Sequence, residues 1–114
     1  CHTKNHIYLP SVKEPDRLWD EIGGCKDVLQ KELGVPVDWY CYPTGGFTEE
    51  IKALVKKAGY KGACTTARGF AIGNKDVYEL KRVKVTNSDT TKPFSFWAKL
   101  SGYYNLFRRQ KAGG

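Results

Sequence analysis

The chain has 114 residues, of which 40% are hydrophobic and 27% charged, and it carries a formal net charge of +7. This balance is typical of one small globular domain and excludes disordered and fibrous chains. No apolar run approaches the roughly 20 residues that span a bilayer, so the sequence predicts no transmembrane segment. The positive charge favours anionic partners, such as nucleic acid, an anionic lipid surface or acidic polymers of a cell envelope, without choosing among them.

The first predicted element is an amphipathic helix over residues 15–33. Its apolar residues recur at spacings of three and four, at Leu18, Ile22, Cys25, Leu29 and Leu33. Pro15 suits the first turn of this helix and Gly34 suits its exit. Residues 35–42 are β-branched and aromatic and are followed by Pro43-Thr44-Gly45-Gly46, so they predict a buried strand that runs into a turn.

A second helix is predicted to begin after Thr48, which suits its N-cap, and to end at Gly59. Its apolar face would consist of Ile51, Leu54, Val55 and Ala58. Residues 60–66 predict a second strand, and residues 77–85 predict a third strand of more edge-like character, because lysines alternate there with apolar residues.

The last predicted helix covers residues 93–109. Aromatic and apolar residues recur at helical spacing in it, at Phe94, Trp97, Leu100, Tyr104 and Phe107. Gly102 weakens this helix locally. Strands and helices alternate along the chain, and a parallel connection between strands needs a crossover that is usually helical. The sequence therefore predicts one α/β domain over residues 1–114, with parallel strands alternating with helices and an extra C-terminal helix.

The four cysteines are Cys1, Cys25, Cys41 and Cys64. They include no C-x-x-C pair, and they are too widely spaced for a disulfide-rich miniprotein or a zinc ribbon. Cys25 falls on the apolar stripe of a predicted helix, and Cys41 and Cys64 fall in apolar strand-like runs. We therefore expect buried free thiols, with a redox role as the alternative.

The two histidines of the chain, His2 and His6, are separated by three residues in the segment Cys1-His2-Thr3-Lys4-Asn5-His6. Two imidazoles four positions apart can face one point, and a neutral imidazole is a good zinc ligand. A zinc site usually takes at least three protein ligands, so the spacing alone also fits two surface histidines near a chain terminus.

Three stretches of the chain together form a more specific pattern. They read CHTKNHIYL (1–9), WYCYPTGGF (39–47) and IKALVKKAGYKGACTT (51–66). In order and spacing they resemble the polysaccharide deacetylase superfamily, which includes the NodB homology domain and the family-4 carbohydrate esterases, over roughly residues 1–85. The resemblance implies the C-terminal portion of a deacetylase-like catalytic domain. It also implies part of a deformed (β/α) barrel whose metal site lies at the C-terminal ends of the strands.

The resemblance also implies roles for the two histidines. His2 and His6 match the family's His-Ser/Thr-x-x-His motif, which supplies two ligands of Zn²⁺ or another divalent metal, and Thr3 occupies the Ser/Thr position. The family's third ligand is an aspartate on an early strand, next to the aspartate that acts as general base. We expect both aspartates upstream of Cys1. With both histidines assigned to the metal, no histidine is left to act as general acid.

The segment Tyr42-Pro43-Thr44-Gly45 resembles the family's third motif, a turn that follows a strand. The family uses a backbone N–H of this turn to hold the oxyanion, which corresponds here to the N–H of Thr44. Tyr42, Pro43 and Gly45 are then expected to contact substrate. Cys41 replaces an arginine that supports the base in one form of the motif. A tight Pro-Gly corner without chemistry remains the structural alternative.

The implied activity is that of a metal-dependent hydrolase that removes N-acetyl groups from a polysaccharide, which is chitin-like, peptidoglycan or an exopolysaccharide. Without the upstream aspartates, the 114 residues alone are expected to be inactive. A secreted or envelope location follows from the same resemblance. The alternative is a non-catalytic deacetylase-like module that binds an anionic glycan. No nucleic-acid partner is expected, because no recognised module accompanies the charge. Half a barrel exposes strand edges, so a dimer or a missing N-terminal half is expected to cover them.

Overall fold

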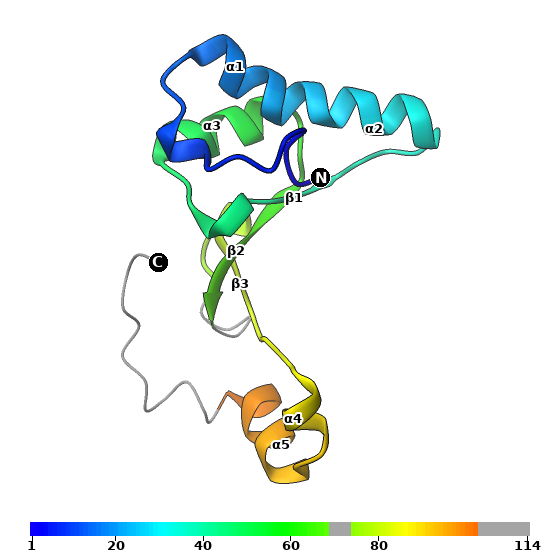
Figure 1. The fold of residues 1–114 in the computed structure, drawn as a ribbon, viewed down its shortest axis with the longest axis vertical. Coiled ribbons are helices and arrows are strands. Elements are labelled where there is room, and N and C mark those ends of the chain that lie inside the picture. Colours follow the sequence, from blue (N-terminus) through cyan, green and yellow to red (C-terminus); the bar gives the residue numbers. More distant parts are fainter. Residues whose placement is uncertain (69–73, 103–114) are drawn as a thin grey trace.

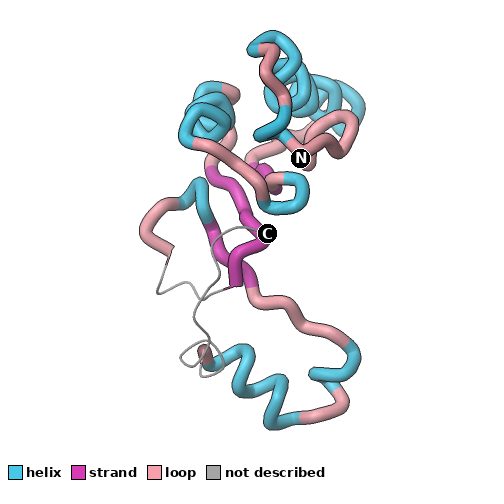
Figure 2. The backbone as a smooth tube through the Cα atoms, turned by 60° about the vertical axis from the view of Figure 1, so that its left-hand side comes forward, coloured by secondary structure: helices cyan, strands magenta, loops and turns pink. Residues whose placement is uncertain are grey.

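The computed structural model describes residues 1–68 and 74–102. Its centre is a three-stranded sheet with the order β1-β2-β3, made of Trp39–Cys41, Gly62–Arg68 and Leu80–Arg82. Both strand pairs are parallel, with Cys41 opposite Cys64 and Cys64 opposite Leu80. Figure 2 shows the three strands side by side between two groups of helices. The expected alternation of parallel strands and helices is confirmed.

The helices lie at two ends of the molecule (Figure 1). The first group consists of α1 (Pro15–Trp19), α2 (Cys25–Leu33) and α3 (Glu49–Lys57), and the second consists of α4 (Asn87–Thr90) and α5 (Pro93–Ser101). The extra C-terminal helix is therefore present as α5, which ends where Gly102 adopts a left-handed φ of 89°. The remainder of the predicted helix, residues 103–109, lies outside the described residues.

The helix predicted over residues 15–33 is confirmed, with an irregularity in its middle. α1 and α2 are joined by a π-helical turn, Asp20–Gly24, whose flanking residues keep right-handed helical angles. The predicted apolar stripe is buried at Leu18, Ile22 and Cys25. Gly34 ends the helix with a φ of 67°, a conformation that glycine adopts without a side-chain clash.

The first and third predicted strands are shorter than their patterns indicated, whereas the second, predicted over residues 60–66, lies two residues later at Gly62–Arg68. In residues 35–42 only Trp39–Cys41 pair, because Val35 and Pro36 lie exposed and proline has no N–H to donate to a ladder. Before β3, the Asp76 carboxylate accepts the Tyr78 N–H at 2.8 Å and caps a 3₁₀ turn over Val77–Glu79. That side-chain bond replaces a ladder bond, so β3 begins only at Leu80.

The core lies between the first helices and the sheet. It consists of Leu9, Leu18, Ile22, Tyr40, Tyr42, Ile51, Val55, Tyr60 and Ala63. Tyr40 contacts the rings of Tyr42 and Tyr60 with centroid distances of 5.4 and 5.1 Å. The Tyr60 hydroxyl donates to the carbonyl of Ile22 at 2.8 Å, so the segment between α3 and β2 is fixed to the helix of residues 15–33. This core fixes the carboxyl ends of β1 and β2 relative to the N-terminal segment.

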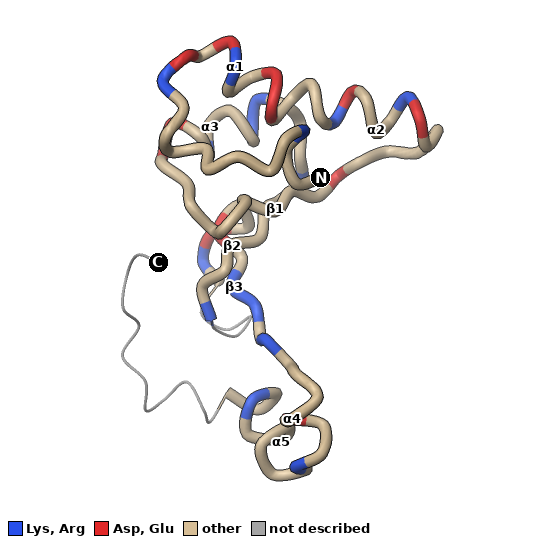
Figure 3. The backbone as a smooth tube through the Cα atoms, in the orientation of Figure 1, with Lys and Arg blue, Asp and Glu red and all other residues tan. Residues whose placement is uncertain are grey.

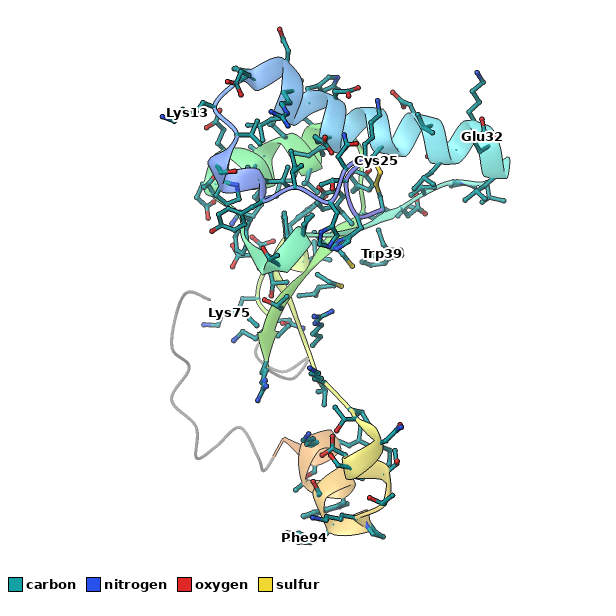
Figure 4. The ribbon with its side chains drawn as sticks, in the orientation of Figure 1. Lys13, Cys25, Glu32, Trp39, Lys75 and Phe94 are labelled. Atoms are coloured by element: carbon teal, nitrogen blue, oxygen red, sulfur yellow. A yellow bond between two sulfur atoms is a disulfide. The ribbon has the colours of Figure 1, made fainter. Side chains whose placement is uncertain are left out.

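The prediction of free thiols was wrong for Cys25. Cys1 and Cys25 form a disulfide, drawn beside Cys25 in Figure 4, whereas Cys41 and Cys64 are free and half-buried. Helical spacing correctly places Cys25 on a buried face. It gives no information on which distant segment covers that face, and here the covering segment is the one that begins at Cys1.

Candidate functional site

The N-terminal segment lies beside β1 and is hydrogen-bonded to it as far as the carboxyl end of that strand. The Cys1 nitrogen donates to the Trp39 carbonyl at 2.8 Å, and the Cys41 N–H donates to the Cys1 carbonyl at 2.9 Å. His2 follows, with its Nδ1 atom 2.7 Å from the Cys41 carbonyl oxygen. The histidine segment is thus held where the turn at Pro43 begins.

The two imidazoles lie close together and are both exposed. Their ring centroids are 4.7 Å apart and their planes meet at 64°. A carbonyl oxygen only accepts, so Nδ1 of His2 donates the hydrogen bond to Cys41 and carries the ring proton. In the neutral ring, Nε2 is then the unprotonated nitrogen, which is the atom that can bind a metal ion. The donor set therefore fits a divalent metal at His2, with His6 beside it.

Within the described residues, three residues other than glycine have a positive φ, and all three lie in the two motifs. They are Thr3 at 61°, His6 at 53° and Thr44 at 54°. Such a conformation costs on the order of 1–3 kcal/mol each, and β-branched residues rarely adopt it. The surrounding contacts must therefore hold these residues in place. Strained backbone of this kind is concentrated at active and ligand sites.

One buried carboxylate holds the segment between the histidines. Glu21, on the π-helical turn, is 2% exposed. Its Oε2 atom accepts the backbone N–H groups of Lys4 at 2.9 Å and Asn5 at 3.0 Å, and its Oε1 atom accepts the Asn5 side-chain amide at 2.5 Å. Sequence analysis missed this residue. The signal was present, because Glu21 is a charged residue on the same helical face as Leu18 and Cys25.

The turn after β1 presents a backbone donor to solvent. Tyr42 N–H donates to the Cys64 carbonyl at 3.1 Å, and Gly45 N–H donates to the Tyr42 carbonyl at 2.9 Å. Between them, the backbone N–H of exposed Thr44 donates to no acceptor in the described parts of the chain. An N–H that is already oriented and unpaired is suited to an anionic oxygen.

The residues predicted to contact substrate differ in how far they are exposed to solvent. Tyr42 is 2% exposed, stacks on Phe47 at a centroid distance of 4.8 Å, and donates its hydroxyl to the Tyr78 carbonyl at 3.0 Å. Burial raises the pKa of the Tyr42 phenol well above its usual value. Pro43 is also buried, and Gly45 is half-buried. Most of the aromatic residues near the turn belong to the core, whereas Trp39 is exposed.

Gly45 allows the turn to approach β2. Its φ is 79°, and a Cβ atom at this position would lie 2.8 Å from the backbone nitrogen of Thr66 and collide with its hydroxyl group. Thr66 in turn donates to the Thr44 carbonyl at 3.3 Å. Only glycine satisfies both the backbone angle and the contact.

The free cysteines form no metal-binding group with the histidines among the described residues. Cys41 and Cys64 are paired across β1 and β2. Burial raises the pKa of the Cys64 thiol, which disfavours the thiolate that binds metals. Within residues 1–68 and 74–102, no three His, Cys, Asp or Glu side chains are grouped so as to hold a metal ion. The described residues thus bring His2 and His6 together and bring Thr44 to the turn that follows β1.

Comparison with known proteins decides the family. A family model described as polysaccharide deacetylase matches residues 1–63, which is more than half of the 114-residue chain. The chain belongs to the polysaccharide deacetylase family. YxkH of Bacillus subtilis (strain 168), named as a member of this family, is 28% identical over 85 residues, which cover 75% of this chain and 30% of YxkH.

Solved structures of deacetylases have the same fold. The Streptococcus pyogenes deacetylase PplD, in complex with acetate, superposes with a TM-score of 0.77 at 26% identity over 86% of this chain and 42% of that protein. A polysaccharide deacetylase from Bacillus cereus gives a TM-score of 0.71 at 29% identity over 87% of this chain and 30% of that protein. The chain spans less than half the length of these relatives and has part of their α/β barrel fold. None of the helices in the described residues is long and apolar enough to cross a membrane.

Proposed function

We propose that this chain carries the histidine side of a metal site in a hydrolase that removes N-acetyl groups from a polysaccharide. The observation that supports this most strongly is the bond between Nδ1 of His2 and the Cys41 carbonyl at 2.7 Å, because it leaves Nε2 free to bind a metal beside the ring of His6. The family to which the chain belongs is the second support.

In this proposal the chain contributes binding and electrostatic groups to the reaction. His2 and His6 would hold Zn²⁺ or another divalent ion, which would supply a bound water of lowered pKa and polarise the acetyl carbonyl. The N–H of Thr44 donates to the carbonyl oxygen as negative charge develops on it. Tyr42 contributes through its backbone, because its side chain is buried. The third ligand and the general base are the two aspartates that the family places before the histidine motif.

The polysaccharide in this proposal is chitin-like, peptidoglycan or an exopolysaccharide, and the location is secreted or attached to the envelope. The disulfide between Cys1 and Cys25 supports that location, because disulfides form and persist in oxidising compartments outside the cytosol. The disulfide supports this location independently of the similarity to known proteins.

A second candidate is a non-catalytic module that binds an anionic glycan. The observation in its favour is the run of basic residues along β3 and the segment after it, at Lys81, Arg82 and Lys84 (Figure 3). Acetate release distinguishes the two functions. In the full protein that contains this chain, a hydrolase releases acetate from N-acetylated oligosaccharides and loses that activity with His2→Ala, whereas a binding module releases none.

The metal site itself is tested by calorimetric titration of the 114-residue chain with Zn²⁺. We expect one-to-one binding that is lost in His2→Ala and in His6→Ala. Cys64→Ala is the matched control, because it removes a neighbouring soft ligand and leaves both imidazoles, and we expect it to bind as the wild type does. Zinc binding that is unchanged in both histidine variants would refute the assignment.

A further inference from the structure

We propose that Glu21 is a positioning residue for the candidate metal site. Its carboxylate holds the backbone between His2 and His6 in the conformation that places the two imidazole rings 4.7 Å apart. The inference rests on the proposed metal function of the two histidines, and it concerns a residue of the helix of residues 15–33, outside the histidine motif itself.

Among the described residues, Glu21 accepts its side-chain hydrogen bonds from Lys4 and Asn5, the two residues that lie between Thr3 and His6. One carboxylate oxygen accepts two successive backbone N–H groups, from Lys4 and Asn5, at 2.9 and 3.0 Å. Successive N–H groups that converge on one anion form a nest, an arrangement that fixes the local backbone angles. The second oxygen accepts the Asn5 side-chain amide, so both oxygens of this carboxylate bind the loop of residues 3–6.

The loop needs such a support because of its backbone conformation. Thr3, before the nest, has a φ of 61°, and His6, after it, has a φ of 53°. Residues with a Cβ atom are unfavourable at these angles, so a free segment would relax to other conformations and separate the two rings. The carboxylate bonds to the N–H groups exist only while the loop keeps this shape, and they oppose that relaxation.

Glu21 can hold the loop because its own position is fixed. It lies in the π-helical turn Asp20–Gly24, a widened turn of a type that is frequent at functional sites. Ile22, next to it, is fully buried in the core. Two further links join the same helix to the same loop, namely the Cys1–Cys25 disulfide and an ion pair of 2.6 Å between Lys4 and Asp20.

The test separates positioning from simple stabilisation. Glu21→Ala removes all three acceptor bonds. Glu21→Gln keeps an amide oxygen for the two backbone N–H groups, and its amide N–H donates to the Asn5 side-chain oxygen once that amide rotates. We expect Glu21→Ala to weaken Zn²⁺ binding by about 10–100-fold at a temperature where the chain is folded, and Glu21→Gln to restore most of that loss. Glu32→Gln, at an exposed position of α2, is the control and is expected to bind as the wild type does.

Two measurements made without metal test the role of Glu21 directly. Hydrogen exchange of the wild-type chain should show slow amides at Lys4 and Asn5, although both residues are exposed. A nuclear Overhauser effect between the His2 and His6 rings should be present in the wild type and in Glu21→Gln and lost in Glu21→Ala. If the wild type binds no zinc while these two results are obtained, metal binding by the two histidines of this chain fails and the role of Glu21 in placing the rings is retained. Unprotected amides, or equal zinc affinity in folded Glu21→Ala, would overturn the inference.

Discussion

Reduction of the Cys1–Cys25 disulfide should destabilise the chain and release the histidine segment from α2. The bridge joins residues 24 positions apart and so closes a loop of 25 residues. In the chain-entropy model, a loop of this length contributes about 3.5 kcal/mol to the free energy of unfolding at 25 °C. With a urea slope of about 1.5 kcal/mol per M, the unfolding midpoint should fall by about 2 M.

The assay is urea unfolding followed by tryptophan fluorescence, with and without a phosphine reductant. Cys25→Ala is the control, because it should unfold at the lower midpoint in both conditions. A wild-type midpoint that is the same in both conditions would refute this reasoning, since it would mean either that the bridge does not form or that it does not restrict the unfolded chain.

Two further outcomes are expected. Gly45→Ala should lower the free energy of unfolding by about 2 kcal/mol, because the new Cβ meets Thr66 at a positive φ. In the same urea assay, Gly34→Ala should lower the free energy of unfolding by only about half as much: its φ is also positive, but no atom lies within 4 Å of its Cβ position. Equal losses in the two variants would contradict a role for the contact with Thr66. The ion pair with Lys99 holds the pKa of Asp89 well below its usual value. The ionised Asp89 therefore stabilises α4 and α5 fully above about pH 4, and this stabilisation is lost as the pH falls toward the lowered pKa. The protection factors of the α5 amides, which are exchange rates corrected for the intrinsic effect of pH, should therefore fall in acid, and Asp89→Asn should remove that dependence; wild-type protection factors that stay constant as the pH falls below about 4 would contradict it.

Elements specified by local interactions were predictable from the sequence. α3 begins after Thr48 because the Thr48 hydroxyl accepts the Ile51 N–H at 3.2 Å, which is a bond between residues three apart. Gly34 ends α2 for an equally local reason, its left-handed backbone. Parallel pairing was predictable from the order of strands and helices. A local signal at α4 was overlooked, since Thr86 and Asp89 form a capping box.

Features that depend on distant segments were not predictable. Cys25 pairs with Cys1, and Glu21 binds Lys4 and Asn5, because the chain folds back on the helix of residues 15–33. The periodicity of apolar residues indicates which face of a helix is buried, but it does not indicate which segment of the chain covers that face. The assignments of His2 and His6 to a metal, and of the turn after β1 to substrate, came from the family motifs and stay predictions.

The most direct test of the metal site is a crystal structure of the 114-residue chain grown with Zn²⁺, with diffraction measured on both sides of the zinc absorption edge. The structure predicts an anomalous peak about 2.0–2.1 Å from Nε2 of His2 and within bonding distance of a ring nitrogen of His6. A peak only at Cys41 and Cys64, or none near either imidazole, would contradict the proposal that these histidines hold the metal.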